Sequence, residues 1–127
     1  MRAANQCFVC GRDNPIGLKL VFRPDGDGVR AEFVPSDLHV GYDGLVHGGI
    51  LSALIDDALA NVWFARGQEA VTAKLEVRFR REVRPGDHLI IQARPTGTKA
   101  GMYTGRVELR RGDDLVAEGT GLLAIRR

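Results

Sequence analysis

The feature that most constrains this chain is the stretch from His47 to Phe64, which is strongly apolar and contains no proline. Its length allows about five turns of α-helix. At 100° per residue, its apolar side chains cover nearly the whole circumference of the helix instead of one stripe. A helix that is apolar nearly all round is buried, so we expect residues 47–65 to form a helix at the centre of the fold.

Two adjacent aspartates, Asp56 and Asp57, lie in the middle of this predicted helix. A charge is costly in a buried helix, so either a gap in the packing lets a carboxylate reach solvent or the pair has a chemical role. A carboxylate that water solvates poorly, with a second one beside it, is expected to have a raised pKa and to be a better base or nucleophile. Both residues are therefore candidate functional groups.

Length and composition predict one domain over residues 1–127, of which 44% are hydrophobic. The formal net charge is only +2, from 18 basic and 16 acidic residues, so nothing global indicates a nucleic-acid partner or a membrane surface. No apolar run approaches about twenty residues, and the first residues lack the apolar core of a signal peptide. We expect a cytoplasmic protein.

Alternating hydrophobic residues predict strands on both sides of the helix. Before it, alternation in residues 18–22 and 29–33, with a turn at 24–28, predicts a hairpin. After it, four strands are predicted at 70–80, 88–94, 102–110 and 115–125, separated by turns rich in glycine and proline. An antiparallel sheet of five or six strands wrapped round one long helix is an α+β architecture.

The strand at 70–80 alternates with unusual regularity, and this predicts which side chains face the core. Its odd-numbered residues from Val71 to Phe79 are apolar, whereas Thr72 shares a polar face with Lys74 and Glu76. Thr72 is then an ordinary exposed threonine, unless the beginning of the strand lies at a subunit interface.

Cys7 and Cys10 are separated by two residues, which is half of a typical zinc site. The other candidate ligands are the three histidines, which have no regular spacing. A redox motif needs a helix beginning at the first cysteine, and the following proline and glycines disfavour one. We therefore expect two partly buried thiols in a lead-in segment, residues 1–17, and no stoichiometric metal.

The motif GYDGLVHGGILSALIDDALA, with CFVCGRDNPIGLKL before it and VTAKLEVRFRREVRPGD after it, resembles the hot dog fold acyl-CoA thioesterases of the phenylacetate-degradation type. The resemblance extends over nearly the whole chain, and His-Gly-Gly with an aspartate nine positions after the histidine is its specific part. It implies a single hot dog domain that hydrolyses an acyl-CoA thioester to a free acid and CoA, without a cofactor.

The resemblance also implies roles for individual residues. Asp56 matches the catalytic carboxylate, as a general base for water or as a nucleophile on the thioester carbonyl. The backbone N–H of Gly48 matches the oxyanion donor, with His47 beside it, and Thr72 matches a hydroxyl position that orients water in some members. Six residues before the histidine, where several members have Asn or Gln, this chain has Gly41.

Elementary chemistry supports a substrate site at the beginning of the helix. Thioester hydrolysis places negative charge on the carbonyl oxygen, and the free N–H groups of a helix N-terminus attract such a charge. Gly49 lets a substrate approach the backbone closely, and Asp57, the poorly solvated carboxylate beside Asp56, is a further candidate for contact with the substrate. The basic residues Arg78, Arg80 and Arg81 suit the phosphates of coenzyme A, although a solvated charge cluster on an edge strand would look the same.

The spacing of His47 and Asp56 predicts a dimer. Nine residues correspond to about two and a half helical turns, so the two side chains lie on opposite sides of the helix and about 13 Å apart along its axis. Two antiparallel helices facing across a two-fold axis can combine them, each giving its N-terminus to the other's aspartate. We expect a homodimer or a dimer of dimers.

Two other functions remain open on the same fold. The first is binding or sensing of acyl-CoA without hydrolysis, which the glycine at position 41 leaves possible. The second is a hydratase or dehydratase, which would need a differently spaced Asp/His motif that the sequence does not show.

Overall fold

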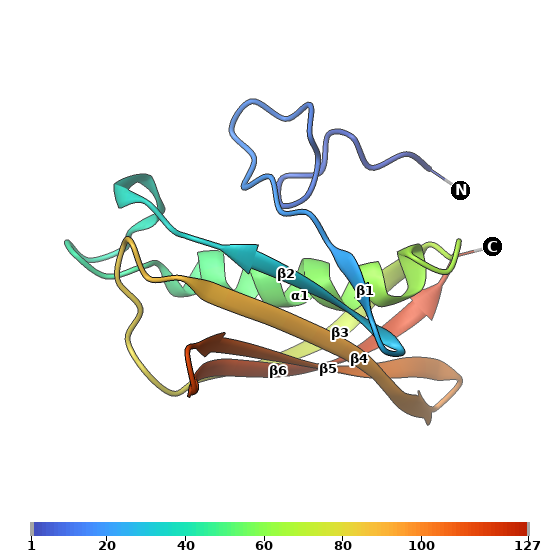
Figure 1. Ribbon diagram of the computed structural model, residues 1–127. Helices are drawn as coiled ribbons and strands as arrows, with labels where there is room; N and C mark the ends of the chain where they lie inside the picture. Colours follow the sequence, from blue (N-terminus) through green and yellow to red (C-terminus); the bar gives the residue numbers. More distant parts are fainter. Residues whose placement is uncertain (1, 127) are drawn as a thin grey trace.

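The computed structural model describes residues 2–126, which form one long helix packed on a six-stranded sheet (Figure 1). Met1 and Arg127, the ends of the predicted 1–127 domain, lie outside the described residues. The elements are β1 (Arg23–Asp25), β2 (Gly28–Phe33), the 3-10 helix η1 (Asp37–His39), α1 (Gly48–Phe64), β3 (Ala70–Phe79), β4 (Leu89–Lys99), β5 (Met102–Arg111) and β6 (Asp114–Ile125).

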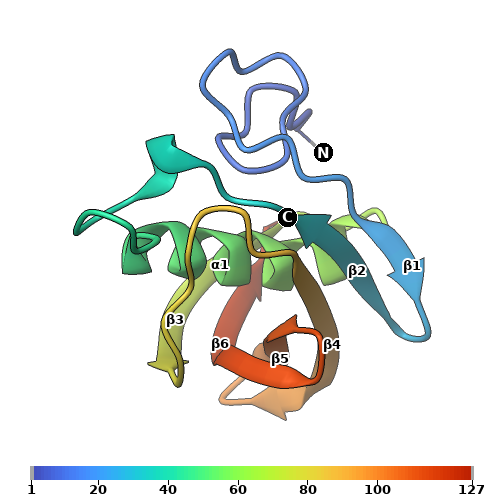
Figure 2. The ribbon, with the colours of Figure 1, turned by 60° about the vertical axis from the view of Figure 1, so that its left-hand side comes forward.

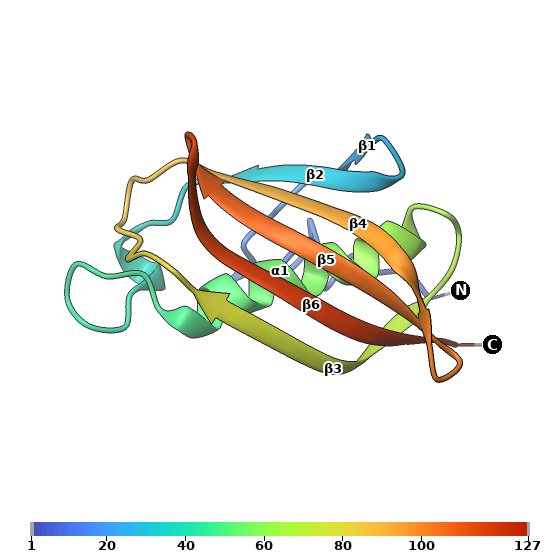
Figure 3. The ribbon, with the colours of Figure 1, turned by 90° about the horizontal axis from the view of Figure 1, so that it is seen from below.

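All neighbouring strands are antiparallel, and their order across the sheet is β1-β2-β4-β5-β6-β3. Figure 3 shows this order, with β3 at one edge of the sheet and α1 behind it. The predicted α+β architecture is therefore confirmed.

The central helix begins and ends where the sequence predicts. His47 is its N-cap and Ala65 its C-cap, so the predicted range 47–65 includes both caps. Leu54, Ile55 and Leu59 on the sheet side have no exposed surface. Truncating any of them to alanine would cost about 2–5 kcal/mol of stability, because the cavity refills only partly.

Three glycines let the helix lie close to the sheet. A Cβ atom on Gly105 or Gly121 would lie 2.8 Å from a methyl group of Leu59, and one on Gly119 would lie 2.6 Å from a methyl of Ile55. A larger residue at any of these positions would force Leu59 or Ile55 to shift. The sheet curves round the helix (Figure 2).

The predicted strand at 18–22 is wrong, although its pattern correctly marks buried side chains. Leu18 and Leu20 are buried, but Lys19 between them has a φ of 59°, which interrupts an extended strand. Their backbone N–H groups donate to the carbonyls of Phe8 and Val9 instead of to a sheet partner. The hairpin with β2 is formed by Arg23–Asp25 instead, so Pro24 and Asp25, which the sequence assigns to the turn, lie in its first strand.

The strand β4 is longer than predicted. The sequence predicts a turn at 95–101, yet β4 continues to Lys99 and pairs with β5 through a bulge between Pro95 and Gly97. Pro95 has no N–H to donate a hydrogen bond to the neighbouring strand. The bulge accommodates it, so the proline does not end β4.

The segment before β1 crosses the face of α1 that the sheet leaves uncovered (Figures 1 and 2). Val9, Leu18 and Leu20 are buried within the core there. The lead-in segment is thus a third layer over the helix. In the described part of the chain, no helix combines the length and hydropathy needed to cross a membrane.

Candidate active site

Asp56 on α1 and Thr72 on β3 form the first half of the site. The Thr72 hydroxyl donates a 2.6 Å hydrogen bond to Asp56 Oδ1, and both side chains are half-buried. Within residues 2–126, Asp56 Oδ2 has no hydrogen-bond donor. One carboxylate oxygen is therefore fixed, while the other remains free for a substrate or a water molecule.

The predicted orientation of Thr72 is wrong, because β3 contains a bulge. The register of β3 against β6 shifts between Thr72 and Lys74. An extra residue in a strand reverses the alternation of side chains on either side of it. Thr72 therefore faces the helix, as Leu75 and Val77 do after the bulge, and Val71 is exposed.

The N-terminus of α1 forms the second half of the site. His47 Nδ1 accepts a 2.7 Å hydrogen bond from the Gly49 N–H, which caps the helix. The Gly49 N–H is thus occupied. The Gly48 N–H has no acceptor among the described residues, so it is available, together with the positive end of the helix dipole, to a substrate oxygen.

The histidine cap also determines which ring nitrogen carries a proton. Because Nδ1 accepts, a neutral His47 imidazole carries its proton on Nε2, and this exposed residue can donate outward. A Cβ atom at Gly41 would lie 3.3 Å from His47 Cδ2. Gly41, where the resemblance implies Asn or Gln, is therefore directly beside the His47 ring, and glycine leaves that space open.

A hollow of about 330 Å³ opens beside the helix N-terminus, and its lining includes Gly48, Leu51, Phe79 and Arg81. Phe79 is half exposed, and its ring lies against Gly48: a Cβ there would lie 3.4 Å from Phe79 Cζ. The hollow combines a free backbone donor, an apolar wall and a guanidinium group. Alternation along β3 predicts an ordinary core position for Phe79. No sequence feature near Phe79 indicates that the end of this strand lines a pocket.

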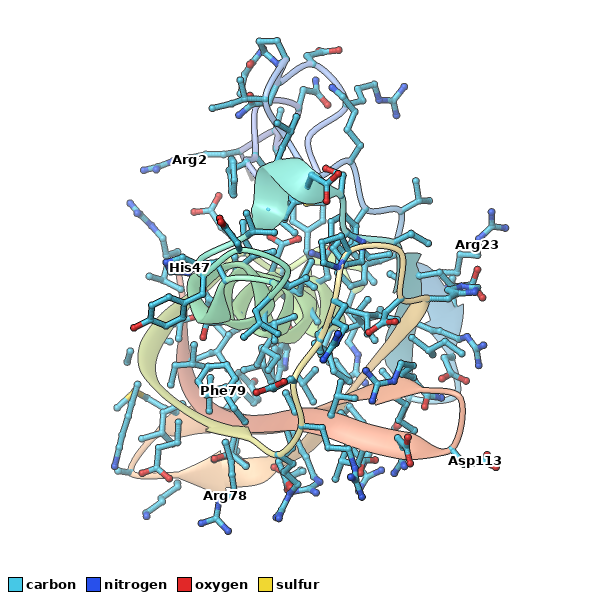
Figure 4. All side chains as sticks on the ribbon, turned by 90° about the vertical axis from the view of Figure 1, so that its left-hand side faces the viewer. Arg2, Arg23, His47, Arg78, Phe79 and Asp113 are labelled. Atoms are coloured by element: carbon cyan, nitrogen blue, oxygen red, sulfur yellow. The ribbon has the colours of Figure 1, made fainter. Side chains whose placement is uncertain are left out.

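The three arginines predicted to bind phosphate do not share one surface: Arg80 and Arg81 both line this hollow, and Arg78 does not. Figure 4 shows Arg78 on the opposite side of β3 from Phe79, away from the helix. Arg80 pairs with Glu118, which also accepts a 2.9 Å hydrogen bond from Arg106. The hydrogen bond from Arg80 lowers the pKa of the Glu118 carboxyl. Arg81 has no ion-pair partner among residues 2–126.

Asp57 faces the lead-in segment, on a different side of α1 from Asp56. Its Oδ1 accepts a 3.3 Å hydrogen bond from the Cys7 thiol, and its Oδ2 accepts one of 3.1 Å from the Asn61 amide. Burial raises the pKa of the Asp57 carboxyl. Burial, followed by the charge of Asp57, raises the pKa of the Cys10 thiol far above its ordinary range. The structure therefore separates Asp57 from the residues around Gly48.

Within one chain, the two halves of the site are far apart. Asp56 and Gly48 are eight residues apart on one helix, or about 12 Å along its axis, so they cannot touch one thioester carbonyl together. Thr72 and Asp56 lie near the start of β3, whereas Phe79 and Gly48 lie near its end.

Comparison with known proteins gives independent information about the family of this chain. Residues 43–118 match the family model described as Thioesterase superfamily, and this span includes His47, Asp56 and Thr72. A curated protein of Deinococcus radiodurans named "Putative esterase" is 31% identical over 88 residues, which are 69% of this chain and 60% of that protein. The match thus covers less than two thirds of the relative's own length.

Solved structures share the whole architecture. A single-residue variant of the phenylacetic acid degradation protein PaaI from Thermus thermophilus is 27% identical, with a TM-score of 0.76 over 87% of this chain and 95% of that chain. A hypothetical thioesterase of Streptococcus pneumoniae, solved with coenzyme A, is 19% identical, with a TM-score of 0.77 over 84% of this chain and 85% of that chain. At this identity the second likeness indicates the fold alone.

Proposed function

The chain belongs to the thioesterase superfamily and has the hot dog fold, and we propose that its substrates are acyl-CoA thioesters. Hydrolysis then yields a free acid and coenzyme A. The observation that carries this proposal is the hydrogen bond between Thr72 and Asp56, which positions a half-buried carboxylate with one free oxygen. The coenzyme A bound to the Streptococcus pneumoniae protein is consistent with this substrate class.

Asp56 supplies the base or the nucleophile of the reaction. Its free Oδ2 either takes a proton from water or attacks the thioester carbonyl itself. Thr72 favours the water route: its hydrogen is given to Asp56, so its oxygen lone pairs remain free to accept a hydrogen bond from the same water. In this proposal, that contact takes the water-orienting role that the resemblance assigns to an amide at the position of Gly41.

The Gly48 N–H stabilises the negative charge that develops on the carbonyl oxygen. It is unpaired among residues 2–126 and lies at the positive end of a helix of 17 residues. An oxyanion donor of this kind contributes about 2.7–4 kcal/mol to transition-state stabilisation. His47 fixes the first turn through its cap, and its Nε2–H is available as a second donor.

Each site is proposed to use two chains, in a cytoplasmic homodimer or dimer of dimers. The outer edge of β3 has no strand partner within residues 2–126, although it is 10 residues long and carries exposed Val71 and Phe79 near its two ends. Such an edge favours pairing with a second strand. If β3 pairs antiparallel with its own copy about an axis between Leu75 and Glu76, Thr72 lies opposite the partner subunit's Phe79. Asp56 of one chain then approaches Gly48 of the other.

A hydrolysis screen tests the proposal. Wild-type protein is incubated with short, long and aromatic acyl-CoA esters while thiol release is followed. We expect turnover of at least one ester, and a loss of about a hundredfold or more in kcat for Asp56→Asn, as for a positioned general base. The matched control is Asp57→Asn, one residue away on the other side of the helix, which should change kcat little.

Two outcomes would reject this assignment. If Asp57→Asn abolishes turnover while Asp56→Asn is nearly silent, the catalytic carboxylate is the neighbouring one. If the wild-type protein binds acyl-CoA esters tightly and hydrolyses none of them, the chain is an acyl-CoA binding or sensing protein, and the open space at Gly41 is the first place to look for the cause.

A further inference from the structure

Cys7, Cys10 and Asp57 form a cluster that the proposed reaction does not use. One ligand-type atom from each, two thiol sulfurs and one carboxylate oxygen, lies within 4.8 Å of the other two. Among them, Cys7 Sγ lies 3.3 Å from Asp57 Oδ1. Two of the groups belong to the lead-in segment and the third to α1, so the cluster connects two layers of the fold.

The backbone around Cys7 is already arranged to hold a thiolate. Cys7 Sγ accepts hydrogen bonds from the backbone N–H groups of Val9 and Cys10, each 3.4 Å long. The turn closes through a 2.9 Å hydrogen bond from the Gly11 N–H to the Cys7 carbonyl. A Cβ atom on Gly11 would lie 2.3 Å from Cys7 N, so only glycine fits there. Backbone donors directed at sulfur favour its anionic form.

The Asn61 side chain holds the carboxylate of the cluster in place. The Asn61 amide donates to Asp57 Oδ2 at 3.1 Å and to the Asp57 backbone carbonyl at 2.8 Å. Oδ1 is therefore the oxygen directed at the cysteines. In protein metal sites, the ligand's other polar atom, the one that does not bind the metal, is usually held by a hydrogen bond in the same way.

We propose that Cys7, Cys10 and Asp57 bind one Zn²⁺ ion that joins the lead-in segment to α1. Thiolate sulfur and carboxylate oxygen are both zinc ligands, at about 2.3 Å and 2.0–2.2 Å, and tetrahedral angles then place sulfur and oxygen about 3.5 Å apart. The observed 3.3 Å agrees with this separation. Binding converts the two thiols to thiolates and releases their two protons to solvent, and a water molecule completes the fourth position.

This proposal differs from the sequence-based expectation of no stoichiometric metal, and a zinc titration decides between them. That expectation considered only cysteine and histidine as partners, whereas the third ligand is an aspartate that folding brings from the central helix. The ion is structural in this proposal, because Asp57 faces away from Asp56 and Thr72. It also gives Asp57 a role other than binding substrate.

The test uses the whole protein, purified in reductant, stripped with a chelator and titrated with Zn²⁺ in competition with a chromogenic chelator. We expect one zinc per chain. Co²⁺ in its place should give a thiolate-to-cobalt charge-transfer band. Asp57→Asn, which preserves shape, should weaken zinc binding by more than the roughly 10–100-fold that loss of an outer hydrogen bond costs. Asn61→Ala should fall within that range.

The adjacent carboxylate provides the matched control, because Asp56→Asn should still bind one zinc with wild-type affinity. Zinc should also raise the Tm of the wild-type protein and leave that of Asp57→Asn unchanged, a readout that is independent of hydrolysis. Three outcomes would overturn the proposal: no zinc binding by the reduced wild-type protein, equal affinity in Asp57→Asn, or isolation of the protein with a Cys7–Cys10 disulfide and no metal.

Discussion

Thr72 Oγ1 lies 2.6 Å from Asp56 Oδ1 and donates its hydrogen to it, which ties the first residues of β3 to the middle of α1. The contact exists because a bulge at the start of β3 turns Thr72 towards the helix. Through it, the strand fixes the rotamer of the candidate catalytic carboxylate. The hydroxyl is therefore expected to matter for the rate and not for the fold.

Replacing Thr72 by valine tests this positioning role. A hydrogen bond to a charged group is worth about 1.5–3 kcal/mol, so Thr72→Val should lower kcat roughly 10- to 100-fold with a smaller change in KM. Thr72→Ser keeps the hydroxyl and should restore most of the rate. Steady-state kinetics, with the thermal midpoint as a check on folding, give the answer. Equal losses in the valine and serine variants would mean that the methyl group, and not the hydroxyl, supports the site.

Arg78 lies on a different face from Arg80 and Arg81, and this separates their expected effects. Arg81 lines the hollow beside Gly48, so Arg81→Ala should raise KM for an acyl-CoA about tenfold or more, as expected for a lost charge-assisted contact with phosphate. An acyl thioester without the nucleotide should show no such increase. Arg78→Ala, on the far side of the sheet, is the matched control. Similar effects on both substrates would show that Arg81 does not bind the phosphates.

Arg80→Ala is expected to behave differently from Arg81→Ala, because Arg80 is paired with Glu118 and Arg106 shares that carboxylate. Its removal should change KM less than removal of Arg81. This refines the sequence-based prediction, which treated the basic run as one surface.

Asp87 makes stability depend on pH. Its Oδ2 accepts a 2.9 Å hydrogen bond from the Arg84 N–H and one of 2.8 Å from Arg111 Nη1. The backbone hydrogen bond, followed by Arg111, lowers the pKa of the Asp87 carboxyl from its ordinary 3.8. The unfolded chain therefore binds a proton at higher pH than the folded one. The resulting stabilisation is complete at a pH above the pKa that Asp87 has in the unfolded chain. It is lost as the pH falls through the lower pKa that Asp87 has in the folded chain.

Asp87→Asn should accordingly lower the free energy of unfolding near neutral pH, by about 1 kcal/mol or less because the pair is partly exposed. The difference from wild type should disappear in acid, below the folded pKa of Asp87. Urea unfolding over a pH series measures both effects. Asp113→Asn, in the exposed turn between β5 and β6, removes a carboxylate of the same charge and serves as control. A difference that persists unchanged in acid would contradict the linkage.

The sequence correctly predicts those structural features that depend on residues close to one another in the chain. The helix limits follow from a proline-free apolar run with His47 directly before the glycines, and the structure has the cap there. The glycine-rich turns after β5 and before β2 are equally local. Leu18 and Leu20 are correctly predicted to be buried, but Lys19 departs from strand geometry because the lead-in segment supplies their hydrogen-bond partners.

The features that the sequence could not predict all depend on distant contacts. The bulge that turns Thr72 inward arises in the pairing of β3 with β6, and alternation alone indicates the opposite face. Asp57 meets Cys7 across 50 residues. One local signal was available: Asp57 and Asn61 are four residues apart and therefore lie on the same side of the helix, which Asp56 does not share.

The dimer proposal makes the sharpest prediction, because it assigns Asp56 and Gly48 of one site to different chains. Two inactive variants are needed, Asp56→Ala and Gly48→Leu. A single Cβ at Gly48 fits, since it would lie 3.4 Å from Phe79, so the longer leucine side chain should block the hollow and leave the helix intact. Each variant alone should be folded, dimeric and inactive.

Co-refolding the two variants should restore activity. In a mixed dimer, one site receives both defects and the other receives neither, so random pairing recovers about a quarter of the wild-type sites. Differently tagged chains show by pull-down how much exchange has occurred, and activity should rise in proportion to it. If exchange is complete and the mixture remains as inactive as its components, each site lies within one chain. Gly48 is then not the oxyanion donor for the carbonyl that Asp56 acts on, because about 12 Å along the helix axis separates the two.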